Sequence, residues 1–371
     1  MKIALVAPYF HPVKGGREQT VLALAEGLAK KGHYVTVFTT NRTPEGKIVD
    51  VREENWDFSV NRIRSTYLAF RFEIPLKIPQ LSGYDIVHII STDNIFAFIF
   101  LMSAKIHRKR IFTTLFTVFA LLRHPRKMLR PFFLFFELLS VVTMYLSDGV
   151  QVMNDVDMKI VKRFVKNVRM IPGGIPENYF IAKPTIDFRD RHGLSKRRVI
   201  LFVNRIHPLK GPQLLIKALP DIMKEFPDVS IVLIGHDPVG FSNELKKIAE
   251  KLGVLDQVLF LGFVDEDEKI AAYDAADVVA IPSIGEFTEG FSIVLSEAWA
   301  RGKTVVVTPS RALRDRVKSG SGYVAGYDAK SLAEAIVQGI KKPTTSPKVH
   351  SWYEVVDMIE NEYSICCKSL N

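Results

Sequence analysis

Two acidic residues, Glu289 and Glu297, flank the start of a predicted helix in the stretch GEFTEGFSIVLSEAWARGKTVVV, residues 285–307. We expect this helix to begin at Gly290 and to end at Gly302. The first backbone amides of a helix lack intrahelical partners and form a ready binding site for an anion. Glu289 stands at that site, and Glu297 lies about 80° around the helix from it at about 100° per residue. The spacing predicts that both carboxylates reach one ligand, with a phosphate at the amides and sugar hydroxyls at the acids.

Two basic residues, Arg205 and Lys210, follow a predicted strand in the stretch FVNRIHPLKG. Arginine grips phosphate oxygens with a fork of N–H donors and lysine adds a compact positive charge, so the two suit a diphosphate. The alternatives are a solvated basic loop for these two residues and an acid on the helix surface for Glu297. Together with Glu289, the residues predict a site for a nucleotide sugar, in which a diphosphate links two hydroxyl-rich rings.

A pair of glycines, Gly15 and Gly16, lies between the first predicted strand and the first predicted helix. The pattern is not G-x-G-x-x-G, so the dinucleotide-binding fingerprint is absent. Adjacent glycines permit close approach of the backbone to a ligand. An ordinary tight turn is the alternative interpretation.

Alternating strands and helices must position these residues. Continuous apolar runs separated by helical periodicity are typical of parallel sheets covered on both faces. The expected strands of the first half are residues 2–7, 34–40, 85–90, 110–116 and 149–153; those of the second half are 199–204, 229–235, 257–261, 277–282 and 303–307, with helices at 211–225, 241–252, 267–275 and 290–301.

The fold class predicted from this alternation is α/β, with two doubly wound, Rossmann-like domains. We expect an N-terminal, acceptor-side domain at residues 1–185 and a C-terminal, nucleotide-sugar-binding domain at residues 186–348. A C-terminal helix at residues 349–371 is expected to pack back on the first domain. Open α/β sheets bind ligands at the carboxyl ends of their strands, so we expect the site in a cleft between the two domains.

The sequence resembles the retaining glycosyltransferases of family four, which have the GT-B fold. The resemblance covers nearly the whole chain and is carried by PYFHPVKGGREQTVLALAEGLAKKGHYVTVFT, DGVQVMNDVDMKIVKRF, RMIPGGIPENYF, VNRIHPLKG, FLGFVDEDEKIAAYDAADVVAIPS and EGFSIVLSEAWARGKTVVV. The seven residues between the two glutamates, with Gly-Phe after the first, form its most specific part.

The resemblance implies a role for each matching position. Arg205, Lys210 and Glu289 would be the catalytic residues, with the two cations on the donor diphosphate and Glu289 on the transferred sugar. Glu297 would hold the donor ribose. The remaining donor-binding positions would be Gly15 and Gly16 near the diphosphate, Gly290, Phe291 and Ser292 at the sugar and phosphate, and Gly262, Phe263 and Val264 over the base.

The sequence departs from the family pattern at one position of the first domain. Members usually carry a histidine after the fourth strand in a T-x-H setting, where FTTLFTVF places Phe116. No Asp-x-Asp stands in a suitable loop, so we expect positive side chains in place of a divalent metal and no cofactor. The predicted reaction is transfer of a sugar from a nucleoside diphosphate to an acceptor hydroxyl with retention at the anomeric carbon.

The charge of the chain points to an anionic partner. Its 371 residues carry a formal net charge of +10, and basic residues cluster in KIHRKR and RHPRKMLR. The adjoining PFFLFFELLSVVTMYL is shorter than the ~20 residues that span a bilayer and contains Glu137. We therefore expect contact with an anionic membrane surface and a lipid-linked or phosphorylated acceptor, through Arg123, Arg126, Lys127 and Arg130. The alternative is a core helix beside a solvated basic loop.

Two adjacent cysteines near the C-terminus, Cys366 and Cys367, give no disulfide framework or zinc-binding spacing, which favours a reducing, cytoplasmic compartment. Rival functions are a sugar-nucleotide epimerase on the same scaffold and a non-catalytic protein that binds nucleic acid or membranes through its basic face. No recognition helix or stacking motif for nucleic acid is recognisable. A nucleic-acid partner is therefore not expected.

Overall fold

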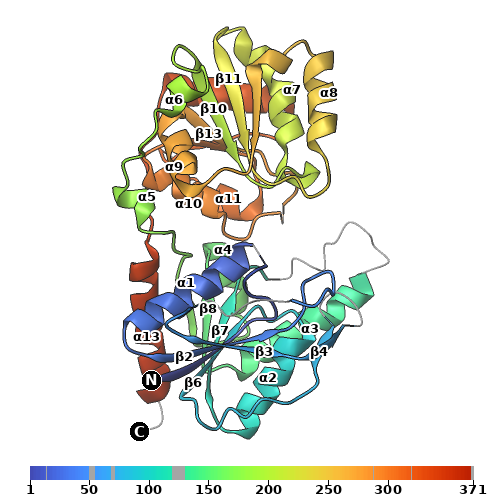
Figure 1. Ribbon diagram of the computed structural model, residues 1–371, viewed down its shortest axis with the longest axis vertical. Coiled ribbons are helices and arrows are strands. Elements are labelled where there is room, and N and C mark those ends of the chain that lie inside the picture. Colours follow the sequence, from blue (N-terminus) through green and yellow to red (C-terminus); the bar gives the residue numbers. More distant parts are fainter. Residues whose placement is uncertain are drawn as a thin grey trace. The chain divides into compact units, whose positions relative to one another are not determined.

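The computed structural model describes residues 1–13, 15–49, 55–67, 72–118, 130–286, 288–318 and 320–368. The chain forms two compact units, of which the first comprises Met1–Gly174 and His350–Asn371 and the second comprises Ile175–Val349 (Figure 1). The boundary predicted at residues 185 and 186 lies later in the chain. The second unit begins earlier because Ile175 and Tyr179 are buried in its core.

A parallel sheet of seven strands, in the order β3-β2-β1-β6-β7-β8-β9, forms the centre of the first unit. Its central strands β1, β6 and β7 are buried along almost their whole length because helices cover both faces. A separate antiparallel pair, β4 and β5, lies outside this sheet. The strands are β1 (Lys2–Val6), β2 (Tyr34–Thr40), β3 (Ser59–Ile63), β4 (Ser65–Tyr67), β5 (Glu73–Pro75), β6 (Ile86–Ile90), β7 (Arg110–Leu115), β8 (Gly149–Val152) and β9 (Val168–Met170).

The C-terminal helix α13 (Trp352–Lys368) belongs to the first unit, as predicted. It packs beside α1 (Gly16–Lys30), and its buried residues Val355, Val356, Ile359 and Tyr363 join one core with apolar residues of α1 (Figure 1). The other helices of this unit are α2 (Ile95–Ile106), α3 (Arg130–Leu146) and α4 (Asp155–Val161).

A buried polar chain ties α13 to the sheet of the first unit. The Tyr363 hydroxyl lies 2.6 Å from His88 Nδ1, and His88 Nε2 lies 2.7 Å from Thr114 Oγ1. Thr114 donates to Gln151 Oε1 at 2.6 Å, so its hydroxyl must accept from Nε2 and the Tyr363 hydroxyl must donate to Nδ1. Complete burial lowers the pKa of His88 to about 3, which keeps the ring neutral in this chain of bonds.

The second unit repeats the doubly wound pattern with six parallel strands in the order β12-β11-β10-β13-β14-β15. The strands are β10 (Arg198–Val203), β11 (Val229–Ile234), β12 (Val258–Gly262), β13 (Val278–Ile281), β14 (Thr304–Val307) and β15 (Tyr323–Val324); the helices are α5 (Asn178–Ile181), α6 (Phe188–Arg191), η3 (Pro208–Lys210), α7 (Pro212–Met223), α8 (Ser242–Lys251), η4 (Leu255–Gln257), α9 (Glu266–Ala275), α10 (Ile293–Ala300), α11 (Arg311–Arg316) and α12 (Ala329–Lys341).

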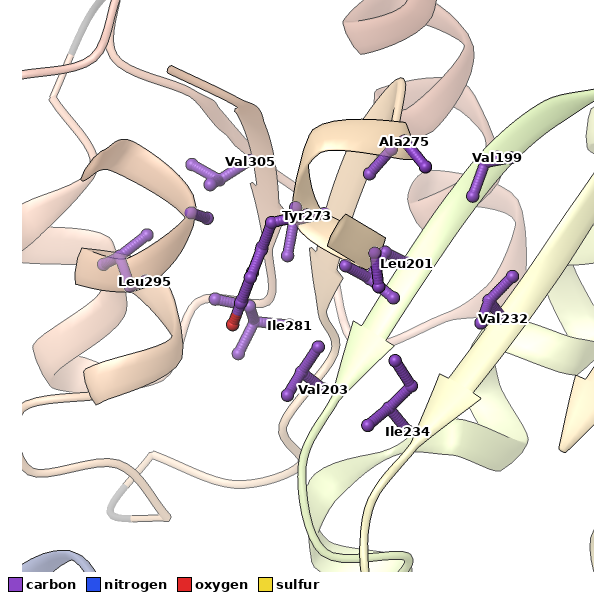
Figure 2. Packing of buried hydrophobic residues seen from close by; sticks show 14 of the residues in the cluster. Val199, Leu201, Val203, Val232, Ile234, Tyr273, Ala275, Ile281, Leu295 and Val305 are labelled. Carbon is purple, nitrogen blue, oxygen red and sulfur yellow. The ribbon is translucent and has the colours of Figure 1, made fainter. Parts of the chain in front are cut away.

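The two faces of this sheet carry two separate apolar cores. Alternate residues of β10 illustrate the division, because Leu201 joins the core under α9 and α10 whereas Phe202 joins the core under α7, α8 and α12. Figure 2 shows the first core, in which Tyr273 of α9 lies among Leu201, Ile281 and Leu295. Both sheets are parallel and covered on both faces, which confirms the predicted fold class of two Rossmann-like domains.

Candidate active site

The loops that carry the predicted donor residues meet at one edge of the second sheet. Arg205 and Lys210 follow β10, Gly262 ends β12, and Glu289 lies after β13. Because the strands are parallel, their carboxyl ends share the same edge, where open α/β sheets bind ligands. The structure therefore brings the predicted residues of this unit to one region.

Lys210 and Glu289 form a buried ion pair. Lys210 Nζ lies 2.6 Å from Glu289 Oε1, and the two side chains are 13% and 7% exposed. The hydroxyl of Ser283 donates to the same oxygen at 2.6 Å, and Lys210 also donates to the Thr288 carbonyl at 3.4 Å. The pair places an ammonium group and a carboxylate side by side, which are the types of group that can bind an anion and a hydroxyl.

A close backbone approach sets the position of Lys210. The next residue, Gly211, has a φ of 75°, and a Cβ at this position would lie 1.8 Å from the Pro282 carbonyl oxygen. Only glycine meets both requirements, because it tolerates a positive φ and carries no Cβ. The loop after β10 can thus pack directly against the loop after β13 that leads to Glu289.

Glu297 of α10 is buried, which rules out the interpretation as an acid on the helix surface. It is 5% exposed, and both carboxylate oxygens have partners. The Tyr273 hydroxyl donates to Oε2 at 2.7 Å, and Lys269 Nζ lies 3.3 Å from Oε1. Lys269 also pairs with Glu266 at 3.1 Å. Glu297 therefore sits at the centre of a polar cluster inside the second unit.

The residues around Glu297 keep its charge compensated. Burial, together with the charge of Glu297, raises the pKa of Tyr273 well above its ordinary value, so the hydroxyl remains a donor. Burial alone would lower the pKa of Lys269, but the carboxylates of Glu297 and Glu266 outweigh it and raise that pKa. Asp265 fixes the start of α9 by accepting a hydrogen bond from the Glu268 amide at 2.8 Å.

The sequence reasoning missed Lys269 and Tyr273 as neighbours of Glu297. They lie four residues apart on α9 and so share one face of that helix. Helical spacing could have paired the two with each other. The meeting of that face with α10 depends on the tertiary structure.

The helix α10 begins at Ile293, so the prediction that it begins at Gly290 is wrong. Ser292 precedes it with a φ of 57°, in the left-handed region, and provides no side-chain cap. The apolar run after Gly290 suggested a longer helix, but the left-handed residue interrupts it. Glu289 thus lies in a loop, and the angle of about 80° between the two acids does not apply.

The start of α10 retains the features of an anion site. The first amides of any α-helix have no intrahelical acceptor. The Ser292 hydroxyl is buried and has no hydrogen-bond partner among the residues that the structure describes. The amides of Ser292 and Ile293 and this hydroxyl follow Glu289 of the ion pair by three and four residues in the chain.

Arg205 differs from Lys210 in being exposed. Its backbone amide donates to Asn204 Oδ1 at 3.0 Å, and its side chain faces solvent. Partial burial and, after it, the positive charges of Arg205 and Lys210 in the same loop lower the pKa of His207. This is the electrostatic environment that a diphosphate requires.

The segment predicted to cover a base follows β12. Gly262 has a φ of 69°, Phe263 is 73% exposed, and Val264 packs against the core below α9 and α10. The exposed ring at the carboxyl edge of the sheet offers an aromatic surface for a base.

Gly15 and Gly16 belong to the first unit. Gly15 precedes α1 in an extended conformation that any residue adopts, and Gly16 is the first residue of the helix. The following Arg17 donates to Ser91 Oγ at 2.8 Å and lies 5.3 Å from the centroid of the Phe116 ring. Phe116, which stands where the resemblance implies a histidine, thus lies under the guanidinium of Arg17.

Of the residues predicted to contact a membrane, Arg123, Arg126 and Lys127 lie outside the described residues. Arg130 is the exposed first residue of α3. Helix α3 buries one face, and exposed apolar side chains line the other face at the spacing of neighbouring helical turns. They are Leu134, Phe135, Leu138, Val142 and Tyr145, each between 40 and 73% exposed.

None of the helices in the described part of the chain is both long and apolar enough to cross a membrane. Helix α3 is 17 residues long and buries Glu137.

Two family models together match most of the chain. Residues 14–179 match the model described as Glycosyltransferase Family 4, and residues 185–354 match the model described as Glycosyl transferases group 1. The first contains the glycine pair, and the second contains both glutamates and both cations.

Curated relatives carry names of mannosyltransferases and related enzymes. A phosphatidyl-myo-inositol mannosyltransferase of Mycolicibacterium smegmatis is 29% identical over 348 residues, which cover 91% of this chain and 84% of the relative. A GDP-mannose-dependent alpha-(1-6)-phosphatidylinositol monomannoside mannosyltransferase of the same species is 32% identical over 174 residues, 45% of each chain.

Solved structures share the fold over the full chain. A sucrose-phosphate synthase of Thermosynechococcus elongatus has a TM-score of 0.74 at 22% identity and covers 98% of both chains. Anabaena HepE in complex with UDP-glucose has a TM-score of 0.72 at 20% identity, with full coverage of both chains. At these identities the likeness establishes the fold.

Proposed function

The chain belongs to the group 1 glycosyltransferases of family four, which have the GT-B fold, and on that premise we propose a specific reaction for it. It is a retaining, metal-independent hexosyltransferase that moves a sugar from a nucleoside diphosphate sugar to the hydroxyl of a lipid-linked or membrane-surface glycan. The observation that carries the donor half of this proposal is the Lys210–Glu289 pair, whose glutamate precedes the uncapped start of α10 by only a few residues in the chain.

The proposed donor site uses each group according to its chemistry. Lys210, Arg205 and the amides at the start of α10 take the diphosphate, because all of them present positive charge or N–H donors. Glu289 accepts hydrogen bonds from hydroxyls of the transferred sugar. Glu297 accepts them from the ribose by exchanging one of its present bonds to Tyr273 or Lys269.

In the proposed reaction, the bond between the anomeric carbon and the diphosphate oxygen breaks, and the acceptor oxygen forms a new bond on the same face of the sugar. The acceptor proton passes to the departing phosphate, so atoms and charge balance without a further reactant. Negative charge grows on the leaving phosphate, and Lys210, Arg205 and the amides stabilise it more in the transition state than in the bound donor. These cations occupy the role that a divalent metal has in other transferases.

The acceptor half of the proposal rests on the first unit and on the relatives. The two curated relatives are named for phosphatidylinositol-type lipids, and one is named for GDP-mannose. The apolar outer face of α3 suits the boundary of a lipid bilayer, and the net charge of +10 suits an anionic one. We place the protein on the cytoplasmic face, where its free cysteines stay reduced.

Thermal-shift titration with GDP-mannose and UDP-glucose tests the donor site. We expect at least one of the two to raise the melting temperature of the wild type, because a ligand that binds only the folded state stabilises it. The shift should be lost in Lys210→Ala and Glu297→Ala. Lys224→Ala is the matched control, since this lysine is 75% exposed and, among the described residues, forms an ion pair with Asp221 three positions before it. Equal shifts in all four proteins would refute the proposed site.

Product analysis separates the transferase from the epimerase. The enzyme is incubated with radiolabelled GDP-mannose or UDP-glucose and vesicles that contain phosphatidylinositol. Transfer of label to lipid, unchanged by EDTA and with the anomeric configuration of the donor, supports the proposal. Isomerised donor in the absence of lipid would favour the epimerase instead.

A further inference from the structure

Arg316, the last residue of α11, grips the loop that leads into α10. Its Nη1 donates to the carbonyl oxygens of Phe291 and Ser292, the latter at 3.0 Å, and its Nη2 donates to Ser296 Oγ at 2.7 Å. The guanidinium carbon lies 4.0 Å from the centroid of the Phe291 ring and 5.3 Å from that of Trp299. Neutral oxygens and aromatic faces therefore surround this cation, and within the described ranges no carboxylate forms an ion pair with it.

Because peptide groups are planar, the contacts of Arg316 with two carbonyl oxygens also fix the direction of the two amides in the same peptide groups. In a planar trans peptide, the carbonyl of one residue and the amide of the next point in opposite directions. Bonds from Arg316 to the carbonyls of Phe291 and Ser292 therefore direct the amides of Ser292 and Ile293 away from the guanidinium. These two amides belong to the start of α10, where the proposed donor phosphate binds.

The same bonds hold Ser292 in an unfavourable conformation. A non-glycine residue with a φ of 57° is sterically strained, and another backbone conformation would turn its two peptide planes. Arg316 fixes both planes at once, because one nitrogen contacts both carbonyl oxygens. Its charge also polarises the two peptide groups and strengthens their N–H donors.

We propose that Arg316 is a positioning residue that orients the amides of Ser292 and Ile293 toward the phosphates of the donor. This inference rests on the proposed donor site and adds to it a residue from a separate helix, α11. Arg316 acts through the backbone of the loop and does not touch the donor itself. A lysine cannot replace it fully, because a single ammonium lacks the fork that reaches the two carbonyls and Ser296 together.

The test compares ligands with and without phosphate. The affinities of the wild type for GDP and UDP, and for guanosine and uridine, are measured by calorimetry and ligand-observed NMR. Arg316→Met keeps the length of the side chain and removes its donors. We expect it to lose about tenfold in affinity for the nucleoside diphosphate that the wild type prefers, the size of a strong hydrogen bond, with the affinity for the nucleoside unchanged. The affinity of Arg316→Lys for this nucleoside diphosphate should lie between those of the wild type and Arg316→Met.

Two further variants control for charge and for folding. Lys318→Met removes an exposed charge two residues further along the chain and should bind like the wild type. Ser296→Ala removes a single partner of Arg316 and should show a smaller loss of diphosphate affinity, even if Arg316→Met folds poorly. An unchanged diphosphate affinity in both Arg316→Met and Ser296→Ala, or an equal loss for diphosphate and nucleoside, would overturn this role. A wild type that binds no nucleoside diphosphate more tightly than its nucleoside would overturn the proposed donor site as well.

Discussion

At the scale of single residues, the Lys210–Glu289 pair is the most informative feature of the second unit. Burying two charges costs desolvation energy that their attraction often only balances, and apolar residues of similar size would serve stability as well. A bound donor would give Lys210 a phosphate and Glu289 a sugar hydroxyl as a new partner, without either side chain having to move far. We therefore interpret the pair as a donor site that is charge-neutral before the ligand binds.

The pair predicts that removing Lys210 alone destabilises the protein more than removing the charges of Lys210 and Glu289 together. Lys210→Met should lower the free energy of unfolding by about 3 kcal/mol, because it leaves Glu289 buried without its cation. Adding Glu289→Gln to the same chain should recover part of that loss. Urea denaturation gives the free energy of unfolding of the wild type, the single variant and the double variant. Lys224→Met is the exposed control and should change this free energy by less than about 0.5 kcal/mol. A double variant less stable than the single one would show that the charges do not compensate each other.

The residues of the candidate donor site were selected from spacing and chemistry, whereas most of their neighbours were not. The structure pairs Lys210 with Glu289 and buries Glu297, and the roles of these residues and of Arg205 toward a donor stay a prediction. The partners of Glu297 come from α9, a different helix, and periodicity shows which residues share a face without showing which helix that face meets. Arg316 was missed for the same reason, since its contacts are carbonyls and rings of another segment.

At the scale of elements, the loop after β10 illustrates how a single glycine positions a charged side chain. Gly211 separates η3 from α7 and lies against the Pro282 carbonyl. Gly211→Ala should lower the free energy of unfolding by at least about 1 kcal/mol. The alanine would have to adopt a left-handed backbone conformation, and its Cβ would clash with the Pro282 carbonyl oxygen. It should also weaken the thermal shift with the donor by displacing Lys210. Gly253→Ala, also at positive φ but with nothing within 4 Å of its Cβ, isolates the cost of the backbone conformation. Equal losses in the two variants would contradict the close-approach argument.

The link between α13 and the first sheet predicts a dependence on pH. The pKa of His88 is about 3 in the folded chain and about 6.5 in the unfolded chain, so the unfolded state binds one more proton between these values. Stability contributed by neutral His88 is complete above about pH 6.5 and is lost as the pH falls toward 3. The free energy of unfolding of the wild type should fall by up to about 1.4 kcal/mol more per pH unit than that of His88→Asn in this range. Parallel curves for the two proteins would show that His88 does not titrate on unfolding.

The central strands could be predicted and several peripheral ones could not. Strands such as β1, β2, β10 and β11 are rich in apolar residues and buried beyond their first residue because they are covered on both faces, and such runs are visible in the sequence. The strands β3, β9 and β15 lie at sheet edges, are short or mixed in polarity, and give no comparable signal. The start of α10 was placed too early because the sequence pattern does not reveal the left-handed conformation of Ser292.

At the scale of the whole molecule, the proposed function assigns the donor to the second unit and the membrane to the first. The apolar face of α3 predicts that Leu138→Glu reduces co-sedimentation with vesicles that contain anionic lipid, because a charge in the bilayer boundary is costly. The thermal shift with the donor should stay as in the wild type. Val239→Glu, on an exposed apolar residue of the second unit, is the control and should pellet like the wild type. Equal pelleting of all three proteins would remove α3 as the membrane contact.

The central claim is that a nucleoside diphosphate sugar binds in the second unit at the start of α10. A crystal structure of the protein with GDP-mannose or UDP-glucose tests it most directly. We predict the diphosphate within hydrogen-bond distance of Lys210 and of the amides of Ser292 and Ile293, with the ribose on Glu297. A ligand bound elsewhere, or a diphosphate that leaves Lys210 on Glu289 alone and those amides unoccupied, would contradict the account.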